Sequence, residues 1–200
     1  QRGHEVANHT QDHPNRFARM SQPQKRAQII EAHDRIGDAC GQGPVGFKSP
    51  GYSFDPGQLE LLAEMGYEYD SSILATLYGP LLRGLQRFLS RGDVDETRYG
   101  SFQHGLAPLE PYRPDPRAPH RRGGTEAGPW EVAVSTMPLL RLPIHSTFVL
   151  TAGTWLFDTG MALLRASGRP VNYSLHGADA VDSVGDPSVA SFRFLVEDWQ

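Results

Sequence analysis

The sequence predicts an α/β protein with parallel strands. Short apolar runs that suit strands alternate along the chain with longer stretches that carry apolar residues at helical spacing. Hydrophobic residues make up 38% of the chain and charged residues 21%, which is typical of a folded globular protein. The 200 residues suit a single domain. Because the first residues carry neither a helix cap nor a strand run, we expect residues 1–200 to be part of a domain that is truncated at its N-terminus.

The helices are predicted from their end signals. Ser21 and Pro23 open a stretch with apolar residues at helical spacing, and Gly41 ends it. Asp55-Pro56 supplies an N-cap and a first-turn proline for a second helix, which stops at Gly66. The expected helices cover 21–40, 55–65, 80–92, 157–166 and a stretch from 186 onward, and the expected strands cover 44–48, 67–69, 131–134, 139–142 and 171–175.

The segment 108–129 differs from the rest of the chain. It holds six prolines among arginines and glycines. Proline removes a backbone hydrogen-bond donor and glycine weakens regular structure, so we predict a long exposed loop. Strand-like apolar runs resume directly after it, which places the loop inside the domain.

Composition excludes several classes of function. The 19 Lys and Arg residues against 23 Asp and Glu give a net charge of -4, which argues against non-specific nucleic-acid binding. Cys40 is the only cysteine, so the chain has no internal disulfide framework and no Cys-rich zinc module. The uncharged run from Leu142 to Phe157 is too short and too polar to span a bilayer. The sequence leaves the compartment open.

Two histidines have the spacing of metal ligands. His9 and His13 are four residues apart, and a helical turn would place both imidazoles on one face, within reach of one metal ion. Zinc is well suited to imidazole ligands. Position 10 is Thr10 rather than glutamate, so this is not the zincin metalloprotease motif. Two surface histidines without a metal are the alternative.

The block from Gly3 to Pro14, GHEVANHTQDHP, resembles the second motif of the polysaccharide deacetylase family (NodB homology, carbohydrate esterase family 4). That motif reads His-Ser/Thr-x-x-His after a Gly-His-Glu run. The run GFKSPGY at 46–52 lies where the family has Arg-x-Pro, and YSLH at 173–176 resembles the late motif that carries a catalytic histidine. The order of motifs agrees over most of the chain, from His4 to about Asp182.

The resemblance implies a distorted (β/α) barrel, smaller than an eightfold one. It implies a hydrolase that removes an N-acyl group, acetyl or formyl, from an amino sugar of a polysaccharide or a glycolipid. The cofactor it implies is a divalent metal, zinc first, held by two histidines and an aspartate. Arg141–Thr147 and Tyr173–Gly177 also resemble the subgroup that deacylates lipid-linked amino sugars.

Roles carry over to this chain residue by residue. His9 and His13 correspond to the metal ligands, and His176 to the general acid that protonates the leaving amine. Lys48 replaces an arginine that pairs with the catalytic aspartate in the family; it keeps the charge but not the bidentate fork. The substrate-binding positions are Pro50, Gly51, Tyr52 and Leu175.

Departures from the family leave a second function open. The family's Asp-Asp motif, which supplies the base and the third ligand, should precede His4, and no Asp-Asp pair occurs in the 200 residues. We therefore expect these residues alone to be inactive. The Asp-Trp motif has no clear match, and residues 140–147 occupy its region. Asp179 could take the place of its aspartate, with an ordinary turn residue as the alternative. His145 could line the substrate groove, with a packed loop histidine as the alternative. A catalytically inactive barrel that binds glycan is the alternative function.

Overall fold

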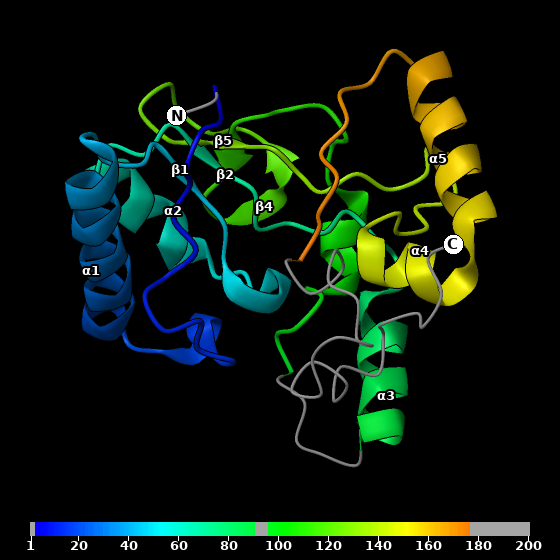
Figure 1. Ribbon diagram of the computed structural model, residues 1–200, viewed down its shortest axis with the longest axis horizontal. Coiled ribbons are helices and arrows are strands. Elements are labelled where there is room, and N and C mark those ends of the chain that lie inside the picture. Colours follow the sequence, from blue (N-terminus) through cyan, green and yellow to red (C-terminus); the bar gives the residue numbers. More distant parts are fainter. Residues whose placement is uncertain (1–2, 91–95, 177–200) are drawn as a thin grey trace.

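The computed structural model describes residues 3–90 and 96–176 (Figure 1). Helices and short strands alternate along the chain, so the predicted mixed α/β class is confirmed. The helix expected from 186 onward, and Asp179, lie outside the described residues.

The helices lie around a parallel sheet. Its strands are β1 (Gly46–Phe47), β2 (Tyr69–Asp70) and β5 (Trp130–Glu131), in the order β1-β2-β5 with every pair parallel. Asn8 extends this order on the other side of β1, through a parallel bridge to Phe47. The strands follow one another across the sheet in chain order, and their carboxyl ends meet at one edge.

Five α-helices surround the sheet in the described part of the chain. Figure 1 shows α1 on one side of the sheet and α4 and α5 on the other. Their bounds are α1 (Gln22–Cys40), α2 (Pro56–Glu64), α3 (Gly79–Ser90), α4 (Ser146–Ala152) and α5 (Thr154–Ala166), with 3-10 turns η1 (Phe17–Arg19), η2 (Pro50–Tyr52) and η3 (Phe102–Leu106).

The predicted end signals of the first two helices are confirmed. Ser21 and Gln24 form a capping box at the start of α1, and Gly41 ends that helix in the left-handed conformation at φ 78°. Pro56 is the first residue of α2. These helices bury Ile29 and Leu62 against Phe47 of β1, which fixes the edge where β1 ends.

The prediction for segment 108–129 is wrong. It contains an antiparallel hairpin of β3 (Pro114–Asp115) and β4 (Ala118–Arg122) rather than a structureless loop. Tyr112 is fully buried in the core, and its hydroxyl donates to the Pro119 carbonyl at 2.6 Å. Burial of this ring fixes the segment. The prolines are tolerated because many backbone N–H groups in a two-stranded ladder need no partner in the other strand.

Two further strand predictions are wrong. Residues 139–142 form a turn in which Leu139 is 95% exposed and both Leu139 and Arg141 have positive φ. Pro138 and Pro143 flank this stretch, and neither ring leaves a backbone donor for a ladder. Residues 171–175 form no strand; the Asn172 and Ser174 carbonyls each accept one backbone bond, from Ser135 and Ser146, both at 3.0 Å.

The described strands form an open sheet, so no closed barrel is seen in residues 3–90 and 96–176. No helix within those ranges is long and apolar enough to cross a membrane.

Candidate active site

His9 and His13 lie where the Asn8 segment leaves the sheet. Their ring centroids are 4.9 Å apart, with the ring planes at 68°. The helical turn that the spacing suggested is wrong: Thr10 and His13 have left-handed backbone, at φ 69° and 50°, and the segment is an irregular loop. The loop, not a helix, brings the two imidazoles together.

Asn8 holds this loop in place, a role that the sequence reasoning missed. Its side chain is fully buried and donates to the Ile29 carbonyl at 2.9 Å and to the Tyr67 hydroxyl at 2.8 Å. Its Oδ1 accepts from the Thr10 N–H at 2.8 Å, which forms a local turn. Its position directly before His9 was the only sequence signal.

The structure orients the His9 ring. Its Nδ1 lies 2.7 Å from the Lys48 carbonyl oxygen, which accepts only if Nδ1 carries the proton. That tautomer leaves Nε2 without a proton. Burial lowers the pKa of His9, and the nearby charges of His13, Lys48 and His176 lower it further, so neutral imidazole is favoured.

Lys48 lies at the carboxyl end of β1, beneath the histidines. Its Nζ donates to the Ser71 carbonyl at 2.8 Å and lies 4.8 Å from the centre of the Tyr52 ring. Burial lowers the pKa of Lys48 to about 8, although the carboxyl groups of Glu131 and Asp70 oppose the shift. The pairing with a catalytic aspartate stays a prediction.

A buried carboxyl pair lies under this edge, and the sequence reasoning did not single it out. Asp70 ends β2 and Glu131 ends β5, and neither is exposed. Asp70 accepts from Gln58 at 2.6 Å and from the Ser72 hydroxyl. Burial raises the pKa of Asp70 to about 7 and raises that of Glu131 well above its usual value. An acidic residue ending an apolar strand run was the available signal.

The predicted substrate-binding positions after β1 occupy different depths. Pro50 and Gly51 line a surface pocket together with His13. Tyr52 is only 7% exposed, and its ring packs against the Lys48 ammonium group and the Tyr99 ring. Gly51 has φ 62°, a conformation in which a side chain would be strained.

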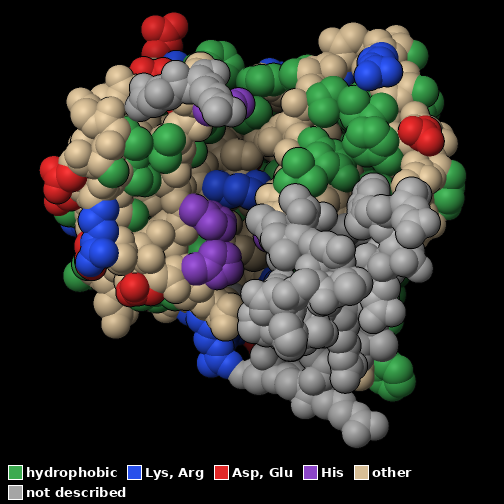
Figure 2. Space-filling view, viewed as in Figure 1, with side chains coloured by type: hydrophobic (Ala, Val, Ile, Leu, Met, Phe, Trp, Pro, Cys, Tyr) green, Lys and Arg blue, Asp and Glu red, His purple; other side chains and the backbone are tan. Residues whose placement is uncertain are grey.

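The late motif lies on the same side of the molecule. Asn172 donates to the Ser71 hydroxyl at 2.8 Å and to the Val132 carbonyl at 2.7 Å, which ties its segment to the ends of β2 and β5. His176 is exposed and acts electrostatically on His9. Leu175 is 68% exposed. Figure 2 shows histidine side chains beside a hollow with a basic side chain next to them.

His145 is not part of this surface. It is 6% exposed, and its ring lies 5.8 Å from that of Tyr52 and 6.4 Å from that of Phe148. It therefore fits the packed-histidine alternative.

The family comparison identifies the first third of the chain. Residues 1–69 match the family model described as polysaccharide deacetylase. This part of the chain is similar to polysaccharide deacetylases. The match contains both histidines of the loop and the run from Gly46 to Tyr52, so the predicted resemblance is confirmed there. The late motif at Tyr173–His176 lies beyond it.

Parts of the chain are similar to a curated protein and to a solved structure. A peptidoglycan deacetylase of Helicobacter pylori (strain ATCC 700392 / 26695) is 32% identical over 78 residues, which are 39% of this chain and 26% of that protein. The chain thus matches about a quarter of that relative's length. A crystal structure assigned to a polysaccharide deacetylase from Mycobacterium smegmatis has a TM-score of 0.48 and 18% identity, over 84% of this chain and 47% of that one.

Proposed function

We propose that this chain is part of a metal-dependent hydrolase that removes an N-acyl group, acetyl or formyl, from an amino sugar of a polysaccharide or glycolipid. The observation that carries the proposal is the His9–His13 pair, with rings 4.9 Å apart at the carboxyl edge of a parallel sheet, inside the stretch that matches polysaccharide deacetylases. A distorted (β/α) barrel belongs to the same proposal.

The histidine pair fits a divalent metal such as zinc. The contact between His9 Nδ1 and the Lys48 carbonyl orients one ring and leaves its Nε2 free, as is usual for metal-bound histidines. The lowered pKa of His9 keeps the ring in the neutral form that binds metal. Within residues 3–90 and 96–176, no group of three metal-ligating side chains occurs, so the proposal names two ligands and no third.

In this proposal each residue has a separate task. A divalent metal held by His9 and His13 supplies the Lewis-acid chemistry that polarises the amide carbonyl and activates water. His176 protonates the leaving amine, and its exposure leaves its ring accessible to substrate. Lys48 supplies a positive charge beneath the site, held by the Ser71 carbonyl. Leu175 forms an apolar wall for the acyl group.

The alternative function is a glycan-binding barrel without catalysis. The observation that favours it is the missing third ligand within the described part of the chain. The two functions differ in a simple assay, because only the enzyme releases acid from its substrate.

The test uses the full-length protein with added zinc and an N-acetylated amino-sugar oligomer, and measures acetate release and bound zinc. We expect His13→Ala to abolish both signals. His176→Ala should lower kcat by about 10²–10⁴-fold while zinc stays bound, because it removes only the general acid. The control is His120→Ala on β4, far from the site in the chain. Zinc binding without any acetate release would refute the hydrolase and support the glycan-binding alternative.

A further inference from the structure

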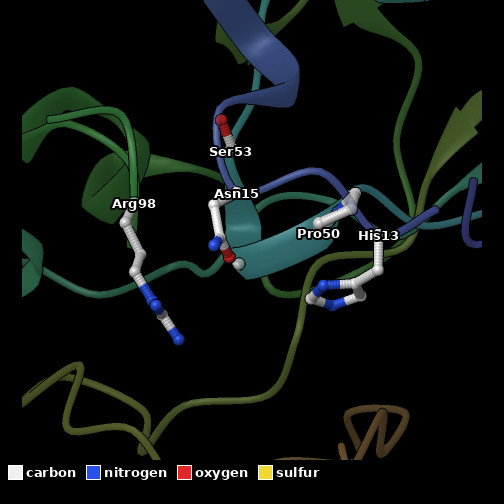
Figure 3. A pocket seen from close by; sticks show the side chains of 6 residues that line it. His13, Asn15, Pro50, Ser53 and Arg98 are labelled. Atoms are coloured by element: carbon white, nitrogen blue, oxygen red, sulfur yellow. The ribbon is translucent and has the colours of Figure 1, made fainter. Parts of the chain in front are cut away.

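A small surface pocket, partly open to solvent, adjoins the histidine pair. It is lined by His13, Asn15, Pro50, Gly51, Ser53 and Arg98. In the view of Figure 3, Asn15 and Pro50 lie between Arg98 and His13. The pocket therefore joins the proposed metal site to an arginine that no motif of the sequence singled out.

The turn that carries Arg98 is firmly attached to its surroundings. Glu96 pairs with Arg19 of η1, and the Thr97 hydroxyl lies 2.5 Å from that of Ser53. The Tyr99 N–H donates to the Gly51 carbonyl at 3.1 Å. Contacts on both sides of Arg98 thus fix its position in the pocket.

The Arg98 guanidinium has no acceptor in the described part of the chain. Its Nε is buried without a hydrogen-bond partner, and its single ring contact is with Tyr99, 5.4 Å from the guanidinium carbon to the ring centroid. A buried donor without an acceptor is costly, and an arginine ordinarily finds a carboxylate or a phosphate. The nearest acidic neighbour in the chain, Glu96, is engaged by Arg19.

The lining itself favours a negative charge. Arg98 and His13 are its titratable side chains, Asn15 adds an amide donor, and none of the six lining residues is acidic. The backbone around the pocket is also strained, since His13, Tyr52 and Tyr99 all have positive φ. Strained backbone of this kind gathers at functional sites and is retained where its placement matters.

We propose that this pocket binds an anionic group of the substrate, a carboxylate or a phosphate, on the glycan next to the amino sugar that is deacylated. The planar guanidinium offers the fork that both groups accept. The Asn15 amide and the Ser53 hydroxyl supply further polar contacts. The inference rests on the proposed deacylase function and adds to it that the substrate is acidic.

The experiment compares three substrates on the full-length zinc-loaded protein. They are a neutral N-acetylglucosamine oligomer, an oligomer in which glucuronic acid alternates with N-acetylglucosamine, and a phosphate ester of the neutral oligomer. We expect kcat/KM to be about 10- to 100-fold higher for one or both acidic substrates, as a charge-assisted hydrogen bond would give. The two acidic substrates tell a carboxylate site from a phosphate site.

Arg98→Gln should erase this preference, measured as the ratio of kcat/KM for acidic over neutral substrate. Arg98→Lys should retain part of it, because lysine keeps the charge and loses the fork. The matched control is Arg87→Gln, which removes the same charge from the exposed face of α3 and should keep the ratio. If Arg98→Gln does not fold, a ratio for Arg98→Lys equal to that of the unaltered protein overturns the inference.

Other outcomes are equally decisive. An unaltered protein that prefers the neutral oligomer, or a ratio that Arg98→Gln leaves in place, overturns the anion site while the deacylase stands. If no substrate releases acetate, the proposed function fails, and calorimetric binding of the same oligomers decides the inference separately. Binding of the acidic oligomers that is weakened in Arg98→Gln would support the anion site. Binding that Arg98→Gln leaves unchanged would overturn it.

Discussion

Replacing Glu131 by glutamine should stabilise the protein at neutral pH and have little effect in acid. Glu131 is fully buried beside Asp70, and burial together with that neighbouring charge raises the pKa of Glu131 well above 4.5. The Ile73 N–H donates to its Oε1 at 2.9 Å, and Oε2 has no partner. Glutamine keeps the shape and the acceptor for Ile73 but carries no titrating proton.

The sign follows from proton binding in the two states. An unfolded glutamate loses its proton near pH 4.5, whereas folded Glu131 keeps it at higher pH. The folded state therefore binds more protons above pH 4.5, and the free energy of unfolding falls as pH rises toward the folded pKa. Each pH unit costs about 1.4 kcal/mol, so retaining the proton at pH 7 costs at most about 3 kcal/mol. The charge of Lys48 reduces that figure.

The assay is urea unfolding of the full-length protein at pH 4.5, 5.5 and 7. The change in the free energy of unfolding caused by Glu131→Gln should be about 1–3 kcal/mol more favourable at pH 7 than at pH 4.5. The new amide donor is unpaired at both pH values, so its cost cancels in this comparison. The control is Glu60→Gln at an exposed position of α2. A variant that loses more stability at pH 7 than at pH 4.5 would refute the reasoning, since Glu131 would then be ionised and paired with Lys48.

Three further substitutions test the support of the histidine loop and the packing of the fold. Asn8→Ala should lower the free energy of unfolding by about 2–4 kcal/mol and weaken zinc binding, because the buried Ile29 carbonyl and Tyr67 hydroxyl lose their donor. An unchanged zinc affinity would show that the loop holds its shape without Asn8. Gly105→Ala should lower the melting temperature, because its Cβ would lie 2.6 Å from a backbone oxygen, whereas Gly84→Ala on α3 meets nothing and should raise stability by about 0.5–1 kcal/mol. Thermal unfolding of both variants compares them, and equal shifts would contradict the packing argument.

The sequence predicted the elements whose signals are local. The start of α1 at Ser21, its end at Gly41 and Pro56 at the start of α2 each depend on a few adjacent residues, and each was found where expected. The hairpin at 114–122 was missed because its stability comes from burial of Tyr112, which is a contact with a distant part of the chain. Composition alone shows prolines there and does not show the core.

The candidate site was predicted in part for the same reason. The proximity of His9 and His13 was predicted, although a left-handed loop produces it and a helical turn does not. The partners of Lys48 were not predictable, because Ser71 lies 23 residues away and joins it only through the pairing of β1 with β2. Arg98 was missed because its turn reaches the site through tertiary contacts alone.

A chain of polar contacts connects the exposed groups of the site through residues that no motif contains. Asn172 ties the late segment to Ser71, the Ser71 carbonyl holds Lys48, and the Lys48 carbonyl orients His9. These contacts form a continuous path from the general-acid candidate segment to the metal-ligand candidate. A single change in the path, such as loss of the Asn172 amide, should therefore displace groups on both sides of it. Substituting the exposed histidines alone would test only the ends of this arrangement.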